Sequence, residues 1–408
     1  MSGADARHAA ARAARESRQR LVAFLSAQTR DVAAAEDALA DAFEAALEVW
    51  PLQGVPEKPE AWLLTTARRR LPDGARHRNV AEGAHGQLLS LAREAAEARA
   101  VFPDRRLELL FVCAHPAIDA AVRTPLMLQV VLGLDAARIA SAFLVKPATM
   151  GQRLSRAKVK IRDAAIAFEV PGERELPTRL DAVLEAIYAA YGTGWSAVPG
   201  GTADHVALAD EALELASLLA RLLPDVPEVL GLEALLLFCD ARRAARTLDG
   251  EYVPLSEQDP ARWSRPMISR AAQLLDLAGR QRRPGRFQLE AAIQSVHAQR
   301  VETGRTDWHA LALLYEGLLR VAPTVGARLG QLAALANARG PEAVWPLLEA
   351  MAPELARAHQ PYWALRAELL RRLGRHDEAR AAYARAIGLS ADEPTRRFLL
   401  RQRESLTG

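Results

Sequence analysis

Apolar residues recur at intervals of three and four through most of this 408-residue chain. The stretch DVAAAEDALADAFEAALEVW shows the pattern clearly, and this spacing is that of an amphipathic α-helix. Its predicted inward face consists of Val32, Ala35, Leu39, Phe43, Ala46 and Val49. Ala, Leu, Arg and Glu dominate the composition and β-branched runs are scarce, so we predict an all-α protein.

Length and charge narrow the class of protein further. A chain of this length exceeds one ordinary core, which predicts several domains. Because 53 Lys+Arg nearly balance 50 Asp+Glu, any surface for nucleic acid must be local. Two cysteines, Cys113 and Cys239, cannot build a disulfide framework and suit a reducing compartment. No apolar run is long enough to cross a bilayer, so we expect a cytoplasmic protein without membrane contact.

Clusters of proline and glycine divide the chain into blocks. The stretches PLQGVPEKPE and LPDG interrupt the first block, and EVPGERELP closes the second. Because a proline inside a helix costs about 3 kcal/mol, Pro72 should end the helix AWLLTTARRR near Leu71. We predict a first domain over 1–78, a linker over 79–98, a second domain over 99–168 and a helical extension over 169–408.

The end of the extension predicts a pair of packed helices. In YWALRAELLRRLGRHDEARAAYARAIGLS, Leu373 and Gly374 end the first helix, and Ala379 and Tyr383 lie on the inner face of the second. The spacing is that of a tetratricopeptide-type repeat, but no 34-residue period continues upstream. We therefore predict a degenerate tetratricopeptide-like helical solenoid, whose concave surface would take a protein or peptide ligand.

Residues 146–162, KPATMGQRLSRAKVKIR, carry six positive charges and no carboxylate. Pro147 suits the first turn of a helix, and Met150, Leu154, Ala157 and Ile161 recur on one face. Just upstream, DAARIASAFLVK predicts a short helix with Asp135 as its N-cap and Ile139, Ala140 and Phe143 turned inward. Two short helices of this kind match a helix-turn-helix, whose second helix reads base edges in the major groove. A solvated basic face on a core helix is the plainer alternative.

A second basic cluster follows the helix AWLLTTARRR and continues into ARHRN. Arginines in these stretches offer phosphate contacts, and an aromatic ring beside them could stack on exposed bases. For Trp62 on that helix we favour a place in the core over a role in stacking.

Four stretches together resemble the extracytoplasmic-function branch of bacterial sigma-70 factors. They are RLVAFLSAQTRDVAAAEDALADAFEAALEVWP, GVPEKPEAWLLTTARRR, RRLELLFVCAHPAI and IASAFLVKPATMGQRLSRAKVKIR. More narrowly, the chain resembles the subgroup with a long tetratricopeptide-like extension, because LSEQDPARW, FQLEAAIQSVHA and TDWHALALLYEGLL follow in the same order. The likeness covers nearly the whole chain.

The resemblance implies roles for named residues. The first domain would be sigma region 2, a helical bundle that binds the β′ clamp coiled coil of core RNA polymerase through Asp37, Leu39, Asp41, Phe43 and Glu44. The same region would contact the −10 element of promoter DNA through Arg68, Arg69, Arg70, Arg76 and Arg78. The second domain would be region 4, which meets the β flap and reads the −35 element through Thr149, Gln152, Arg153, Arg156, Lys158 and Lys160.

No stretch predicts an enzyme, a metal site or a cofactor. Cys113 and His115 are two soft ligands one residue apart without a second pair, so a buried structural cysteine is the better interpretation. We therefore predict an alternative sigma factor regulated in cis by its extension. The alternatives are a diverged helical scaffold, favoured by the LPDG break and by Ala40 in the acidic helix, and a helix-turn-helix regulator that does not recruit polymerase.

Overall fold

The computed structural model describes residues 3–71, 104–143, 145–196, 203–351, 359–390 and 392–407. Within these ranges the regular elements are helices apart from one short hairpin, which confirms the predicted all-α fold. The chain forms two compact units, Met1–Ala190 and Tyr191–Gly408. None of the described helices is long and apolar enough to cross a membrane.

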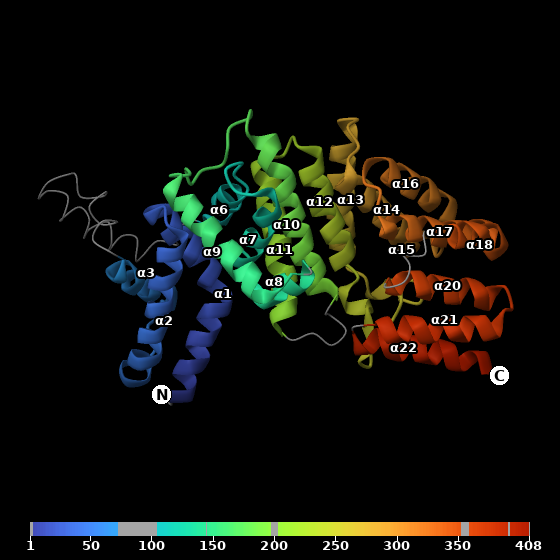
Figure 1. The fold of residues 1–408 in the computed structure, drawn as a ribbon, viewed down its shortest axis with the longest axis horizontal. Helices are drawn as coiled ribbons and strands as arrows, with labels where there is room; N and C mark the ends of the chain where they lie inside the picture. Colours follow the sequence, from blue (N-terminus) through green and yellow to red (C-terminus); the bar gives the residue numbers. More distant parts are fainter. Residues whose placement is uncertain are drawn as a thin grey trace, which may run out of the picture. The chain divides into compact units, whose positions relative to one another are not determined.

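The first unit contains α1 to α3, α6 to α9 and most of α10 (Figure 1). The helices are α1 (Gly3–Thr29), α2 (Val32–Gln53), α3 (Pro59–Arg70), α6 (Arg106–Cys113), α7 (Ala120–Val130), α8 (Ala136–Ala142), α9 (Pro147–Asp163) and α10 (Leu176–Ser196). α1 packs along α2, and α3 contacts both. α6 packs on α1 and α7, and α7, α8 and α9 contact one another. The predicted region 2 and region 4 helices therefore lie within one compact unit.

Local sequence explains where these helices start and what they bury. The Asp31 side chain accepts a hydrogen bond from Ala34 N at 3.1 Å, an N-cap that starts α2. The buried face of α2 is close to the predicted one. It consists of Val32, Ala35, Ala38, Leu39, Ala42, Ala46 and Trp50. Phe43 and Val49, predicted on that face, are only half-buried, because the face turns towards Ala42 and Trp50.

The second unit is a succession of helices in which each contacts its near neighbours in sequence (Figure 1). They are α11 (Ala203–Leu222), α12 (Pro227–Asp240), α13 (Arg265–Arg280), α14 (Arg286–Ala298), α15 (Arg300–Thr303), α16 (Trp308–Val321), α17 (Val325–Arg339), α18 (Pro341–Glu349), α20 (Gln360–Arg372), α21 (His376–Leu389) and α22 (Glu393–Glu404). Short 3-10 turns lie at Arg243–Ala245, Pro260–Arg262 and Ser405–Thr407. α12 is buried on nearly every side, because α11, α13 and α14 all pack against it.

The helix pair predicted near the end of the extension is present. α20 ends at Arg372, Gly374 follows in a left-handed conformation with φ 74°, and α21 starts at His376. A residue with a side chain would be strained at that φ, which explains the glycine. Ala379 and Tyr383 are buried between the two helices, as the spacing predicts.

A hairpin that the helical prediction does not contain lies between the 3-10 turns Arg243–Ala245 and Pro260–Arg262 in the second unit. β1 (Thr247–Leu248) pairs antiparallel with β2 (Glu251–Tyr252). Asp249 and Gly250 between them have φ values of 52° and 79°, the conformation of a two-residue hairpin turn. Glu251 pairs with Arg397 and Arg401 of α22 at 3.2 and 2.7 Å, so the hairpin holds the last helix. The Asp-Gly dipeptide is the sequence signal that predicts such a turn.

Candidate nucleic-acid and polymerase interfaces

The basic helix α9 separates its apolar and polar residues as the sequence predicts. Its buried residues are Met150, Leu154, Ala157 and Ile161. Its exposed residues include Thr149, Gln152, Arg153, Arg156 and Lys160. Among the described residues, no hydrogen bond or ion pair engages the side chains of Arg153, Arg156 or Lys160. These cations are therefore available to phosphate oxygens and base edges, which is the property that a recognition helix needs.

α8, the helix before α9, ends earlier than the prediction of an inward-facing Phe143 requires. Asp135 is the N-cap of α8, because its side chain accepts a hydrogen bond from Arg138 N at 2.8 Å. Ile139 and Ala140 are buried as predicted. The inward placement of Phe143 is wrong, since its ring is 39% exposed. α8 ends at Ala142, so the helical period no longer directs Phe143 towards the core.

Lys158 differs from the other predicted DNA contacts on α9. Its Nζ lies 2.6 Å from Glu36 Oε2 of α2, and the two side chains are only 14% and 18% exposed. At 3.6 residues per turn, Lys158 projects about 140° away from Arg153, on the flank of the apolar face. One turn further, Arg162 Nη1 lies 3.9 Å from the Asp31 carboxylate. Lys158 thus joins α9 to α2.

The acidic face of α2 lies opposite its buried face. Asp37, Asp41 and Glu44 are exposed, and within the described ranges no cation pairs with their carboxylates. Leu39 is buried beneath them and Phe43 is half-buried at the edge. An exposed strip of carboxylates without partners on a rigid helix suits a basic docking surface.

The arginines at the end of α3 differ from one another in exposure and contacts. The Nε of Arg68 donates to Gln28 Oε1 at 3.2 Å, and its guanidinium lies 5.4 Å from the Phe24 ring centroid. Arg69 and Arg70 are exposed in the last turn. α3 ends at Arg70, next to the predicted stop at Leu71. Arg76 and Arg78 lie outside the described residues.

Trp62 is not a fully buried core residue. It is half-buried, and its ring meets the buried Trp50 edge-on with centroids 5.5 Å apart. The preference for the core is therefore met only in part. Trp62 lies on the same helix as Arg69 and Arg70.

Cys113 and His115, the pair considered for a metal, have ordinary surroundings. Cys113 is fully buried, and burial raises the pKa of its thiol far above the usual value. His115 Nδ1 accepts a hydrogen bond from Ala117 N at 3.1 Å. Across the described ranges, no three side chains of His, Cys, Asp or Glu gather in a way that could hold a metal ion.

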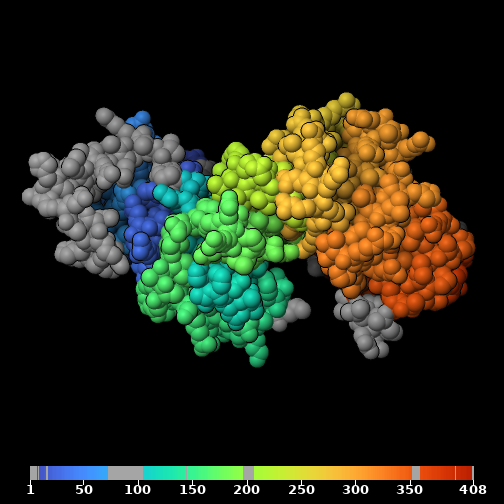
Figure 2. Space-filling view, turned by 90° about the horizontal axis from the view of Figure 1, so that it is seen from above, coloured from blue at the N-terminus to red at the C-terminus, as the bar shows by residue number. Residues whose placement is uncertain are grey.

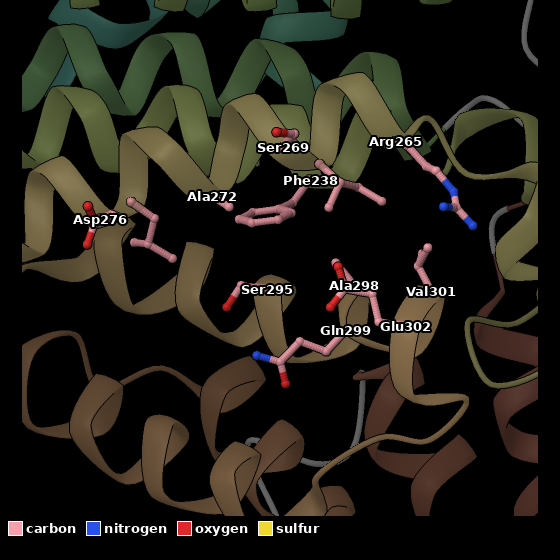
Figure 3. A pocket seen from close by; sticks show the side chains of 12 residues that line it. Phe238, Arg265, Ser269, Ala272, Asp276, Ser295, Ala298, Gln299, Val301 and Glu302 are labelled. Carbon is pink, nitrogen blue, oxygen red and sulfur yellow. The ribbon is translucent and has the colours of Figure 1, made fainter.

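The second unit contains a cavity of about 650 Å³ between α13 and α14–α15 (Figure 3). Phe238 of α12 lies near its centre, with Ala272 of α13 beside the ring. Arg265 and Asp276 lie at opposite ends of the α13 side. This volume is in the range of small-molecule sites, about 300–1,000 Å³. No sequence motif marked the cavity, because its lining comes from four helices with ordinary spacing.

Comparison with known proteins agrees with the arrangement of the first helices. Residues 13–80 match the model of sigma-70 region 2, and residues 179–279 match a family of unknown function, DUF6596. The described helices within residues 13–80 belong to α1, α2 and α3. The chain therefore contains a sigma-70 region 2 domain, as sigma-70 family factors do.

A relative that matches most of the chain is an uncharacterized protein, R00370, of Rhizobium meliloti (strain 1021). It is 38% identical over 385 residues, which span 92% of this chain and 91% of the relative. The chain belongs to the same family as this rhizobial protein. No solved structure matches the chain.

Proposed function

We propose that the protein is an alternative sigma factor of the extracytoplasmic-function type, which binds core RNA polymerase and directs it to promoters. The observation that carries the proposal is the sigma-70 region 2 match over helices whose acidic face is exposed and has no cationic partner among the described residues. A helix with exposed Asp37, Asp41 and Glu44 offers the charge that a basic coiled coil would bind. The protein would act by binding and positioning, without catalysis.

Promoter reading is assigned to the two basic surfaces of the first unit. On α9, Gln152 and Arg153 would pair with bases of the −35 element, and Arg156 and Lys160 with phosphates. On α3, Arg69 and Arg70 would hold the −10 element while the exposed side of Trp62 stacks on an opened base. The absence of carboxylates from 146–162 supports this assignment, since each acid there would repel the phosphates.

The extension would regulate the factor in cis through a protein or peptide ligand. The cavity beside Phe238 supports this part of the proposal, because its apolar centre and charged ends would take one or two side chains of such a ligand. Filling it with Ala272→Trp should abolish the response to that ligand and leave transcription by the unregulated factor intact. Ala272 is exposed, so the larger ring need not disturb the core.

The deciding experiment is co-purification of the full chain with core RNA polymerase, followed by run-off transcription on genomic fragments. We expect the wild-type chain to recruit polymerase and Asp37→Lys/Asp41→Lys to fail. A matched control is Glu173→Lys/Asp181→Lys, which reverses two exposed carboxylates of the same unit away from α2. Absence of co-purification at low salt would reject the proposed function.

One observation favours a second candidate, a helix-turn-helix regulator that does not recruit polymerase. α9 is joined to α2 within one unit, while its reading face stays exposed. Such a regulator would bind duplex DNA by itself and give no run-off transcript with core polymerase. Co-purification with core polymerase, together with a measurement of duplex binding by the chain alone, therefore separates the two candidates.

A further inference from the structure

The cavity beside Phe238 is an elongated groove along one face of α13. Its lining residues on α13 recur every three or four positions, so they share one side of the helix. They run from Arg265 to Asp276, eleven residues further on, which is about 16 Å at 1.5 Å per residue. α14 and α15 form the opposite wall, and the ring of Phe238 lies between the two walls (Figure 3).

The groove is open to solvent along its length. Exposed lining residues come from both walls and are Arg265, Ser269, Ala272, Asp276, Gln299 and Glu302. The space-filling view shows the gold atoms of this part of the chain at the surface (Figure 2). In the middle of the α13 wall the side chains of Ser269 and Ala272 are small, so they leave access to the groove. A segment of polypeptide can therefore lie in it, which a closed cavity would not allow.

Two charges of opposite sign lie at one end of the groove. Figure 3 places Arg265 of α13 and Glu302 of α15 on the same side of Phe238, and Asp276 on the other side. Among the described residues, no hydrogen bond or ion pair engages the side chain of Arg265 or of Glu302. Asp276 is engaged, because Arg280 Nη2 lies 2.7 Å from its Oδ2. The charges left to a ligand are therefore a cation on one wall and a carboxylate on the other.

These features fit a peptide better than a lipid or a small apolar molecule. An apolar side chain can cover the ring of Phe238, while flanking acidic and basic side chains pair with the two walls. The amide of Gln299, which no described residue engages, can donate to and accept from a peptide backbone. A fatty acyl chain would bury the same polar groups without hydrogen bonds, which is costly.

We propose that this groove binds an extended peptide segment in which an apolar residue stands between an acidic and a basic one. The apolar side chain lies on Phe238, the acidic one pairs with Arg265 and the basic one pairs with Glu302. The inference rests on the proposed function in one respect, since it names the chemistry of the ligand through which the extension would regulate the factor. The binding itself requires no polymerase.

The test is a set of double-mutant cycles between the full-length chain and labelled peptides. The parent peptide has a central leucine flanked by a glutamate and a lysine in a Gly/Ser background. A length of about nine residues exceeds the groove at about 3.3 Å per residue. Fluorescence anisotropy measures the affinity. Replacing the leucine by glycine should weaken binding about tenfold.

The two charges of the peptide should depend on different residues of the groove. Replacing the glutamate by glutamine should weaken binding to the wild-type chain about threefold and leave binding to Arg265→Gln unchanged. Replacing the lysine by glutamine should likewise cost about threefold with the wild-type chain and nothing with Glu302→Gln. Arg270→Gln is the matched control, because it removes the same charge from an exposed position of α13 that does not line the groove. Both peptide charges should keep their full effect in that variant.

Three results would overturn the proposal. One is no binding of the parent peptide at about 1 mM, the limit of weak specific affinity. Another is equal effects of the peptide charges in the wild type, Arg265→Gln and Glu302→Gln. The third is undiminished binding to Ala272→Trp, whose larger ring should fill the groove and exclude every peptide.

Run-off transcription keeps this inference apart from the proposed function. Peptide binding with the expected cycles and no transcript would reject the sigma factor and keep the groove as a peptide site. Transcripts from the wild-type chain without peptide binding would reject the groove and keep the sigma factor.

Discussion

Arginine has opposite roles on α9 of the first unit and around α12 of the second. In the first, Arg153 and Arg156 of α9 extend into solvent, and among the described residues nothing pairs with them. In the second, Arg242 is buried, donates to Phe238 O at 3.3 Å and to Gln294 Oε1 at 2.7 Å, and serves the packing of α12 on α14. Arg300 likewise donates to Leu255 O at 2.6 Å and to Gln258 O at 3.2 Å.

The difference shows why a count of basic residues does not locate a nucleic-acid surface. A guanidinium whose donors are already bonded to carbonyls would have to break those bonds to bind a phosphate. Arg153 and Arg156 of α9, with which no described residue pairs, lose only water. The number of unoccupied donors on a surface, and not its arginine content, should decide where DNA binds.

The largest predicted effect is on DNA affinity, and it should come from replacing Arg153 and Arg156 together by alanine. One good bidentate contact to a base is worth about 1–3 kcal/mol, so we expect about a hundredfold loss of affinity for promoter DNA. The slope of log affinity against log salt should also become shallower, because fewer phosphates are neutralised. Fluorescence anisotropy over a series of salt concentrations measures both quantities.

A matched control comes from the second unit. Arg270→Ala/Arg305→Ala removes the same charge from two exposed positions, and we expect about a twofold change or less. Equal losses in the two double variants would mean that only net charge matters, and the assignment of DNA binding to α9 would be wrong.

Much of the α9 surface could be predicted from sequence because it depends on local periodicity. Pro147 starts the helix, and the four buried residues recur at three and four, so the exposed face follows. The end of α3 was also predictable, since Pro72 cannot continue a helix. The predicted inward placement of Phe143 was wrong because α8 stops one residue before it, and periodicity cannot tell where a short helix ends.

The pairing of Lys158 with Glu36 could not be predicted in the same way. The two residues are 122 positions apart, and each is an ordinary charge on the flank of an amphipathic helix. Only the packing of α9 on α2 brings them together and withdraws them from water. The cavity beside Phe238 is a second case, because it arises where α13 and α14 separate over α12.

The second unit should respond to acid through a half-buried histidine. Burial lowers the pKa of His297 to about 4, and the nearby charges of Arg242 and Arg300 add to the shift. The unfolded chain takes up a proton at the ordinary pKa near 6.5 while the folded unit does not, so stability falls as the pH drops between these values. We expect about 2 kcal/mol to be lost between pH 7 and 5 from this group.

Urea unfolding at both pH values measures that loss. His297→Phe keeps a ring against Trp308, whose centroid lies 6.0 Å away, and should lose about 2 kcal/mol less than the wild type over the same interval. His309→Gln replaces an exposed histidine of α16 and should behave as the wild type does. If the two variants respond alike, His297 does not titrate as its burial requires.

The smallest effect should come from the N-cap of α8, and it separates fold from recognition within the first unit. Asp135→Ala removes the acceptor for Arg138 N and should cost about 1 kcal/mol of stability, measured by urea unfolding. Asp307→Ala removes the equivalent cap of α16 in the second unit, where Ala310 N donates at 3.0 Å, and should cost about the same. Because neither carboxylate belongs to the exposed face of α9, DNA affinity of the folded protein should change in neither variant. A loss of affinity in Asp135→Ala alone would show that the first helix of the pair positions the second for DNA, beyond supporting its fold.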